Sequence, residues 1–101
     1  MSSHRRIERI HEQITAMKLI AQGTISKRTK VCGRPNCRCA HDPKSRHGPY
    51  YEWTRCLKGR YVHSILSKKQ AMQLSVAINN YRKLRTLLTR WSKETTSILK
   101  M

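Results

Sequence analysis

The sequence predicts an α+β fold: an N-terminal helix, then a small three-stranded antiparallel sheet, then a long C-terminal helix. Three observations predict it. An apolar stripe of helical period lies near the N-terminus, β-prone segments stand on both sides of a cysteine-rich stretch, and the last third contains neither Gly nor Pro. A chain of 101 residues is expected to form a single domain, with residues 1–22 as helix, 23–66 as sheet and 67–101 as the long helix.

The first helix is predicted from the spacing of its apolar residues. They recur at alternating steps of three and four, at Ile7, Ile10, Ile14, Met17 and Ala21, and therefore share one helical face. Ser2 and Ser3 are suitable N-cap residues, and Gly23 is a suitable C-terminal stop. The stripe is expected to pack against the rest of the chain.

The stretch Val31–Tyr50 reads VCGRPNCRCAHDPKSRHGPY and holds three of the four cysteines. Cys32, Cys37, Cys39 and His47 can form a tetrahedral Cys₃His zinc site. Cys37 and Cys39 are two residues apart, so both sulfurs point to one side of an extended segment. In a reducing compartment clustered cysteines favour a metal over disulfides. The sheet of residues 23–66 is therefore expected to be bound to zinc.

Two other residues compete for the fourth ligand position. His41 lies two residues after Cys39, so a tight chelate is possible, and Cys56 would give a Cys₄ site. His47 is preferred to both. Iron stays open as the metal, because a cysteine-rich site also suits it.

Three β-prone segments surround the cysteine-rich stretch. Thr24–Val31 precedes it, and Tyr50–Cys56 and Tyr61–Leu66 follow it as a hairpin. The hairpin turn is Leu57–Arg60, in which Gly59 can take a positive φ. Within the second segment Tyr51, Trp53 and Arg55 share one face by alternation. That face either covers the small core, which is the preferred interpretation, or stacks on bases.

The last helix is predicted to begin after Ser67, a good N-cap. Its apolar positions form a heptad seam at Leu74, Ala77, Tyr81, Leu84, Leu88, Trp91, Thr95 and Ile98. A helix over residues 67–100 spans about 50 Å, roughly twice the length of the first helix. About half the seam therefore needs another partner: the sheet, a second copy or another protein. The residues expected at this interface are Ala77, Tyr81, Leu84, Leu88 and Trp91.

Charge indicates the kind of partner. There are 22 Lys and Arg residues against five Asp and Glu, a formal net charge of +17. An excess this large indicates a polyanion, and we expect nucleic acid rather than a membrane. The residues expected to contact it are Lys27, Arg28, Lys30, Arg34, Arg38, Arg46, Arg55, Arg82 and Arg85. DNA is preferred to RNA.

A membrane protein, a secreted protein and an enzyme are less well supported by the sequence. No apolar run is long enough to cross a bilayer, and residues 1–10 lack the core of a secretory signal, so a cytoplasmic protein is expected. The five acids are scattered and do not form the carboxylate cluster of a two-metal nuclease. Four ligands would close the zinc shell, so no enzyme activity is expected. His41 beside Asp42 is the one arrangement that could support catalysis.

Four segments resemble a family of small bacterial and archaeal proteins that is described as a domain of unknown function. They are GTISKR at 23–28, CGRPNCRCA at 32–40, HGPYY at 47–51 and NYRKLRTLL at 80–88. The resemblance implies a zinc-ribbon-like sheet followed by a long helix, with Cys32, Cys37, Cys39 and His47 as ligands. It also implies a mobile-element or phage setting. The chain departs from the family pattern in a longer loop at 41–44 and in lacking a Gly-Gly hairpin turn.

These observations favour a non-enzymatic, zinc-stabilised DNA-binding protein with an accessory or regulatory role, which forms a homodimer through its helices. One alternative is a protein that binds RNA or a ribonucleoprotein, since exposed Tyr and Trp side chains can dock on structured RNA. Another is an adaptor whose helical seam binds a larger protein such as a recombinase, with charge only assisting.

Overall fold

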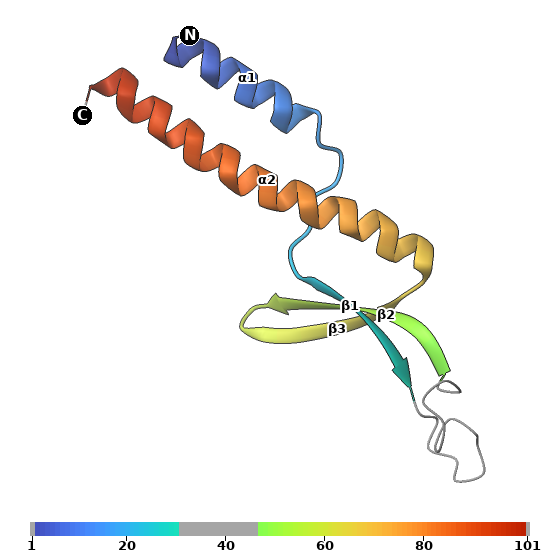
Figure 1. Cartoon of the computed structure of the whole chain (residues 1–101). Coiled ribbons are helices and arrows are strands. Elements are labelled where there is room, and N and C mark those ends of the chain that lie inside the picture. Colours follow the sequence, from blue (N-terminus) through green and yellow to red (C-terminus); the bar gives the residue numbers. More distant parts are fainter. Residues whose placement is uncertain (1, 31–46, 101) are drawn as a thin grey trace, which may run out of the picture. The chain divides into compact units, whose positions relative to one another are not determined.

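The computed structural model describes residues 2–30 and 47–100, and it confirms the predicted α+β fold (Figure 1). The elements in order are α1 (Ser3–Thr15), β1 (Thr24–Lys30), β2 (His47–Leu57), β3 (Arg60–Leu66) and α2 (Lys68–Leu99). They belong to two compact units. One comprises Met1–Gln22 with Val76–Met101, and the other comprises Gly23–Ser75. The single domain expected from chain length stays a prediction.

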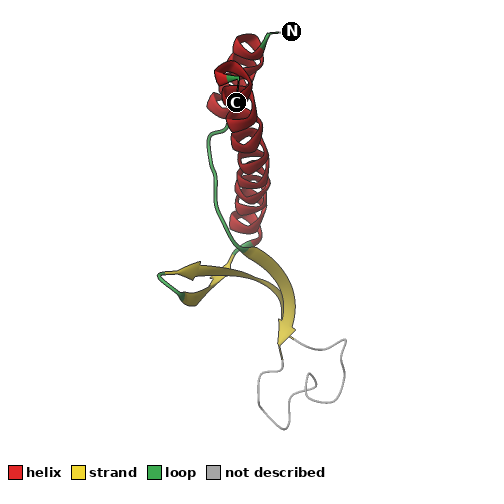
Figure 2. Ribbon diagram, turned by 90° about the vertical axis from the view of Figure 1, so that its left-hand side faces the viewer, coloured by secondary structure: helices red, strands yellow, loops and turns green. Residues whose placement is uncertain are grey.

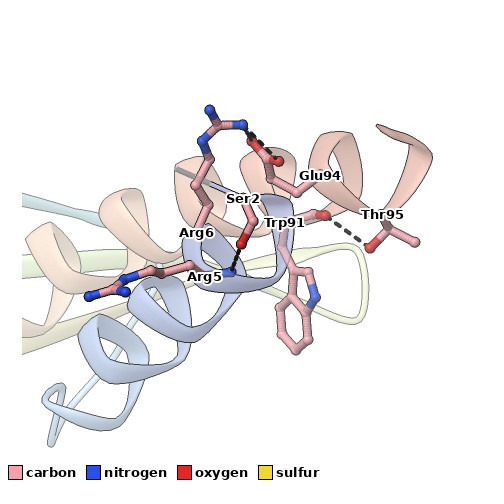
Figure 3. Close-up of polar contacts among 6 residues, drawn as sticks. All are labelled: Ser2, Arg5, Arg6, Trp91, Glu94 and Thr95. Atoms are coloured by element: carbon pink, nitrogen blue, oxygen red, sulfur yellow. Dashed lines mark hydrogen bonds and ion pairs between the residues drawn. The ribbon is translucent and has the colours of Figure 1, made fainter. Parts of the chain in front are cut away.

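In the helical unit, α1 lies alongside the second half of α2 and runs in the opposite direction (Figure 1). Ser2 is the N-cap of α1, as predicted, because its hydroxyl accepts a hydrogen bond from the Arg5 backbone N–H at 3.2 Å (Figure 3). The core of this unit consists of four apolar side chains: Ile10 of α1 with Ala77, Ile78 and Leu87 of α2. Leu87 is only 2% exposed.

The prediction that the first helix reaches residue 22 is wrong, because α1 has 13 residues and ends at Thr15. The Thr15 hydroxyl donates to the His11 and Glu12 carbonyl oxygens at 3.0 and 3.1 Å. The Met17 N–H donates to the Ile14 carbonyl three residues back, which tightens the last turn.

The backbone after α1 bonds to α2 instead of continuing a helix. The Ala21 N–H donates to the Ala77 carbonyl at 3.1 Å, and the Asn80 side chain donates to the Leu19 carbonyl at 2.9 Å. Gly23, expected as the helix stop, instead precedes β1 with a φ of 119°. Tertiary hydrogen bonds have thus replaced the last part of the predicted helix.

The sheet has the order β1-β2-β3, and both pairings are antiparallel (strands labelled in Figure 1). Trp53 of β2 lies opposite Ile25 of β1 and Ser64 of β3, which fixes the register. Lys30 pairs with His47 after an irregularity between Arg28 and Lys30. Lys30, just before the cysteine-rich stretch, and His47, near the end of that stretch, are therefore neighbours across the ladder.

A two-residue turn closes the hairpin between β2 and β3. Lys58 and Gly59 both have positive φ, 50° and 78°, as a type I′ turn requires. The predicted role of Gly59 is confirmed. Lys58 is the unexpected member, because Asn, Asp or Gly usually occupies that position.

The long helix α2 begins with a capping box. The Gln70 N–H donates to the Ser67 hydroxyl at 3.1 Å, and the Ser67 N–H donates to the Gln70 side-chain oxygen at 2.9 Å. This confirms Ser67 as the N-cap. The 32 residues of α2 span about 48 Å. Neither helix, within the part of the chain that the structure describes, has the length and apolarity needed to cross a membrane.

Candidate nucleic-acid interface

One exposed face of α2 combines guanidinium groups with hydroxyl groups. Arg82, Arg85, Thr86 and Thr89 follow at helical spacing and line a shallow, open recess of about 360 Å³. The four side chains are exposed. The Thr86 and Thr89 hydroxyls donate to the Arg82 and Arg85 carbonyl oxygens at 3.4 and 3.1 Å, which fixes their positions. We call these four residues the α2 recess.

The α2 recess carries positive charge that no described carboxylate neutralises. α2 contains a single acid, Glu94, which is absent from the recess lining. Glu94 instead faces α1, where Arg6 Nη1 lies 3.4 Å from both of its carboxylate oxygens (Figure 3). A hydrogen bond from the Ser3 hydroxyl lowers the pKa of Glu94, partial burial opposes this, and the charge of Arg6 lowers it further. Arg82 and Arg85 are therefore available to an external anion.

A second set of cations lies on the edge strand of the sheet. Lys27 and Arg28 of β1 are exposed, and as consecutive strand residues they point to opposite faces. Lys30 ends the strand and pairs with His47. All three residues lie, as predicted, on a strand that leads into the cysteine-rich stretch. Charged residues also protect an edge strand from unwanted pairing, so this strand alone does not decide a function.

Arg55 is committed to contacts within the sheet. Its guanidinium carbon lies 3.9 Å from the centroid of the Trp53 ring, and its Nη1 donates to the Ser64 hydroxyl at 3.1 Å. The stacking confirms that Trp53 and Arg55 share a face. Because these contacts hold the Arg55 side chain against the sheet, the proposed interface does not depend on Arg55.

The predicted zinc ligands lie mostly outside the described residues. Cys32, Cys37 and Cys39 do so, as do the rival ligand His41 and the predicted phosphate contacts Arg34, Arg38 and Arg46. His47 is the first residue of β2. Among residues 2–30 and 47–100, no group of three His, Cys, Asp or Glu side chains could hold a metal.

The structure argues against Cys56 as the fourth ligand. Cys56 is exposed and lies next to the hairpin turn, nine positions along β2 from His47. At about 3.3 Å per residue that separation is about 30 Å. Cys32 follows Lys30 by two residues, and Lys30 pairs with His47. One ion cannot bind both Cys32 and Cys56 of the same chain across that distance.

The residues expected at an oligomer interface divide into two groups. Ala77 is 4% exposed and its carbonyl accepts the Ala21 N–H. Trp91 is half-buried and contacts His11. Tyr81 and Leu84 are half-buried, whereas Leu88 is 48% exposed. Part of the heptad seam therefore belongs to the helical unit itself, and Leu88 is the member left for a partner.

One exposed feature was missed by sequence reasoning. Tyr61 of β3 is 76% exposed, on the face opposite to that of Trp53 and Arg55. The signal that could have identified it is the turn, since a Lys-Gly pair followed by Arg-Tyr places cations and an aromatic side chain at a hairpin end.

These features define a small, basic α+β protein with cationic surfaces on a helix and on an edge strand. A family model described as a domain of unknown function (DUF6788) matches residues 3–75, and the chain belongs to this family. The match extends over α1, the sheet and the first turns of α2. Comparison with curated proteins and with solved structures gave no match. The zinc motif and the mobile-element setting implied by the resemblance stay predictions.

Proposed function

We propose that the chain is a non-enzymatic, zinc-stabilised nucleic-acid-binding protein that acts on DNA in an accessory or regulatory role in the cytoplasm. The observation that carries this proposal is the α2 recess. Two arginines and two threonines share an exposed face there, and no carboxylate lines it. Guanidinium groups bind phosphate oxygens through paired hydrogen bonds, and because the Thr86 and Thr89 hydroxyls donate to helix carbonyl oxygens, the two guanidinium groups are the donors of this face.

Net charge supports a polyanion over a neutral ligand. The chain carries +17, and the ion pairs in the described part are confined to Arg6 with Glu94 and to His63 with Glu52 when His63 is protonated. Most cations are therefore not neutralised within the chain. Phosphate neutralisation by such cations releases counterions and supplies affinity without sequence preference.

A structural role for zinc is supported by the pairing at the start of β2. Because Lys30 and His47 are neighbours in the ladder, the segment that carries Cys32, Cys37 and Cys39 leaves the sheet and returns to it at one place. A metal bound by that segment and His47 would close the loop beside the sheet and stabilise a small fold.

The test is binding of labelled duplex DNA, measured by fluorescence anisotropy over a range of salt concentrations. We expect affinity to fall steeply with salt. The double variant Arg82→Ala/Arg85→Ala should weaken binding about tenfold and reduce the salt slope by about two. Lys83→Ala/Arg90→Ala is the matched control, because it removes the same charge from exposed α2 positions outside the recess.

Two results would reject the proposal. Affinity that does not change between low and moderate salt would exclude a phosphate contact. An equal loss for the recess variant and its control would show that the recess is not the site. Competition by structured RNA and by duplex DNA then decides between RNA and DNA as the natural ligand.

A second candidate is the adaptor function, which the exposed Leu88 and Leu99 favour, at 48% and 62% exposure. The change Leu84→Asp/Leu88→Asp should abolish binding of a protein partner and leave the zinc content unchanged. Loss of zinc in the same variant would indicate that the seam is needed for folding instead of for binding a partner.

A further inference from the structure

The end of the β2–β3 hairpin has an unusual composition for a tight turn. It consists of Leu57, Lys58, Gly59, Arg60 and Tyr61, which we call the hairpin tip, and Figure 2 shows this turn projecting at one end of the sheet. Leu57 pairs with Arg60, and Cys56 pairs with Tyr61. The ladder thus continues up to the turn and holds the tip in one conformation.

Lys58 occupies a position that disfavours it. Its φ of 50° lies in the left-handed region, which is strained for a residue with a Cβ and which Asn, Asp or Gly adopts more readily. Gly59 already provides the second positive φ of the turn. When a residue adopts a backbone conformation that its type disfavours, and its side chain gains no packing from it, a functional use of that side chain is indicated. The amino group of Lys58 is exposed at the tip.

Tyr61 presents an aromatic ring to solvent beside this turn. The side chain is 76% exposed, although tyrosine is usually at least half buried on a sheet. Its cross-strand neighbour Cys56 is small and also exposed, so it covers little of the ring. Leu57 adds a second apolar side chain, at 51% exposure. Because Leu57 pairs with Arg60 and Tyr61 pairs with Cys56, the two apolar side chains lie on opposite faces of the tip, and Tyr61 is exposed on the face that it shares with Cys56.

Charge decides which kind of partner fits this surface. Lys58 and Arg60 stand on the two sides of Gly59, and the sequence has no Asp or Glu from Trp53 to Leu66. The nearest acid along the strands is Glu52, which lies opposite Ile65, about 17 Å from the turn at 3.3 Å per residue. Tyr61 directly follows these two cations, and an exposed aromatic ring next to cations matches a nucleobase next to its phosphates.

We infer that the hairpin tip is a second nucleic-acid contact, in which Tyr61 stacks on an unpaired base while Lys58 and Arg60 bind the flanking phosphates. This inference rests on the proposed function and adds to it a preference for single-stranded or locally opened nucleic acid. A duplex keeps its bases stacked on one another and offers Tyr61 no ring face. The tip contributes little there beyond its charge.

The experiment compares a single-stranded thymidine oligonucleotide, a duplex of equal length and heparin, a polyanion without bases. Tyr61→Ala should weaken binding of the single strand about tenfold and leave heparin binding unchanged, since one base–aromatic stack contributes that much. Tyr61→Phe should keep wild-type affinity. Ile65→Ala, on the same face of β3 at 73% exposure, is the matched control and should have no effect.

Lys58→Asn gives an independent test that separates function from folding. Asn adopts the left-handed region more readily than Lys, so the variant should unfold at the same or a higher temperature. Its affinity for the single strand should nevertheless fall severalfold, because a phosphate contact is lost. Lower thermal stability with unchanged affinity would contradict the role assigned to Lys58.

The inference is overturned if Tyr61→Ala binds the single strand like the wild type, or if it loses heparin binding to the same extent. The second outcome would indicate an acidic protein or another polyanion as the partner. Failure of the wild type to bind any nucleic acid would reject the proposed function itself. Wild-type binding that is indifferent to Tyr61 rejects only the hairpin-tip contact.

Discussion

The imidazole of His11 meets the indole of Trp91 edge-on, with ring centroids 4.4 Å apart and an interplanar angle of 69°. The contact joins α1 to α2, and the ion pair between Arg6 and Glu94 joins the same helices nearer the chain ends. Ile10 is buried beside His11 in sequence, at 5% exposure. A short helix of 13 residues is therefore held by an aromatic contact, an ion pair and one buried apolar side chain.

The aromatic contact should be measurable as a coupling. We expect the double-mutant cycle of His11→Ala and Trp91→Leu to give a coupling free energy of about 0.5–1.5 kcal/mol, the range for edge-to-face aromatic pairs. Urea unfolding followed by circular dichroism provides the four free energies of unfolding. Strict additivity of the two single changes would show that the rings do not interact in solution.

Leu87 and Leu88 are adjacent but differ in burial, at 2% and 48% exposure. Leu87→Ala should lower the free energy of unfolding by about 3 kcal/mol, because it leaves a cavity in the core. Leu88→Ala should cost less than about 1 kcal/mol in the monomer. If a second copy covers the seam, Leu88→Asp should also abolish self-association in sedimentation experiments. A reversed order of the two alanine variants in unfolding would contradict the packing of α2.

Glu94 should contribute to the acid dependence of stability. Its pKa is held below the ordinary value of 4.5, first by the Ser3 hydroxyl and also by Arg6. The stabilisation is therefore complete above pH 4.5 and is lost as pH falls below it, through the pKa of the folded chain. Glu94→Gln should flatten the acid limb of the stability curve. A Glu94→Gln curve identical to that of the wild type at acid pH would contradict this role of Glu94.

Gly23 and Gly59 both have positive φ, but their surroundings differ. A Cβ on Gly23 would lie 2.5 Å from the Thr54 carbonyl oxygen and 2.5 Å from Trp53 Nε1, whereas nothing lies within 4 Å of one on Gly59. Gly23→Ala should therefore cost about 3 kcal/mol, from the backbone and from the clash. Gly59→Ala should cost about 1 kcal/mol from the backbone alone. Thermal unfolding of both variants gives the comparison, and equal losses would refute the close approach at Gly23.

Zinc content separates the candidate ligands. We expect one zinc per chain, lost in Cys32→Ser and kept in Cys56→Ser, because Cys56 lies at the other end of β2 from His47. Chelation should reduce the thermal stability of the wild type and of Cys56→Ser alike. Elemental analysis and calorimetry on the same samples provide both readouts. Zinc loss in Cys56→Ser would require a site shared between two chains.

The fold could be predicted because each element has a local signal. Ser67 with Gln70 marks the start of α2, and Gly59 marks the hairpin turn. The end of α1 could not be predicted, since the bonds from Ala21 and Asn80 that compete with the helix come from residues distant in sequence. The helical periodicity of the sequence likewise placed Leu88 in the heptad seam. It could not predict that Leu87 is the more buried of the two, because burial depends on contacts with residues distant in sequence.

The candidate site was partly predictable for a similar reason. Residue type alone identified Arg82, Arg85 and Arg55 as cations. Only the three-dimensional arrangement shows that Arg55 stacks on Trp53 while the other two line an open recess with threonines. The exposure of Tyr61 depends on which face of the sheet is covered, and alternation within one strand does not reveal that.

The pairing of Lys30 with His47 has a consequence for insertions and deletions in this chain. In an antiparallel ladder paired residues lie about 5 Å apart. The sheet therefore constrains the two ends of the intervening segment but not its length. Lengthening such an insertion costs little, roughly 0.6 kcal/mol for each doubling. The number of residues between these two can therefore change while β1, β2 and the helices keep their sequence.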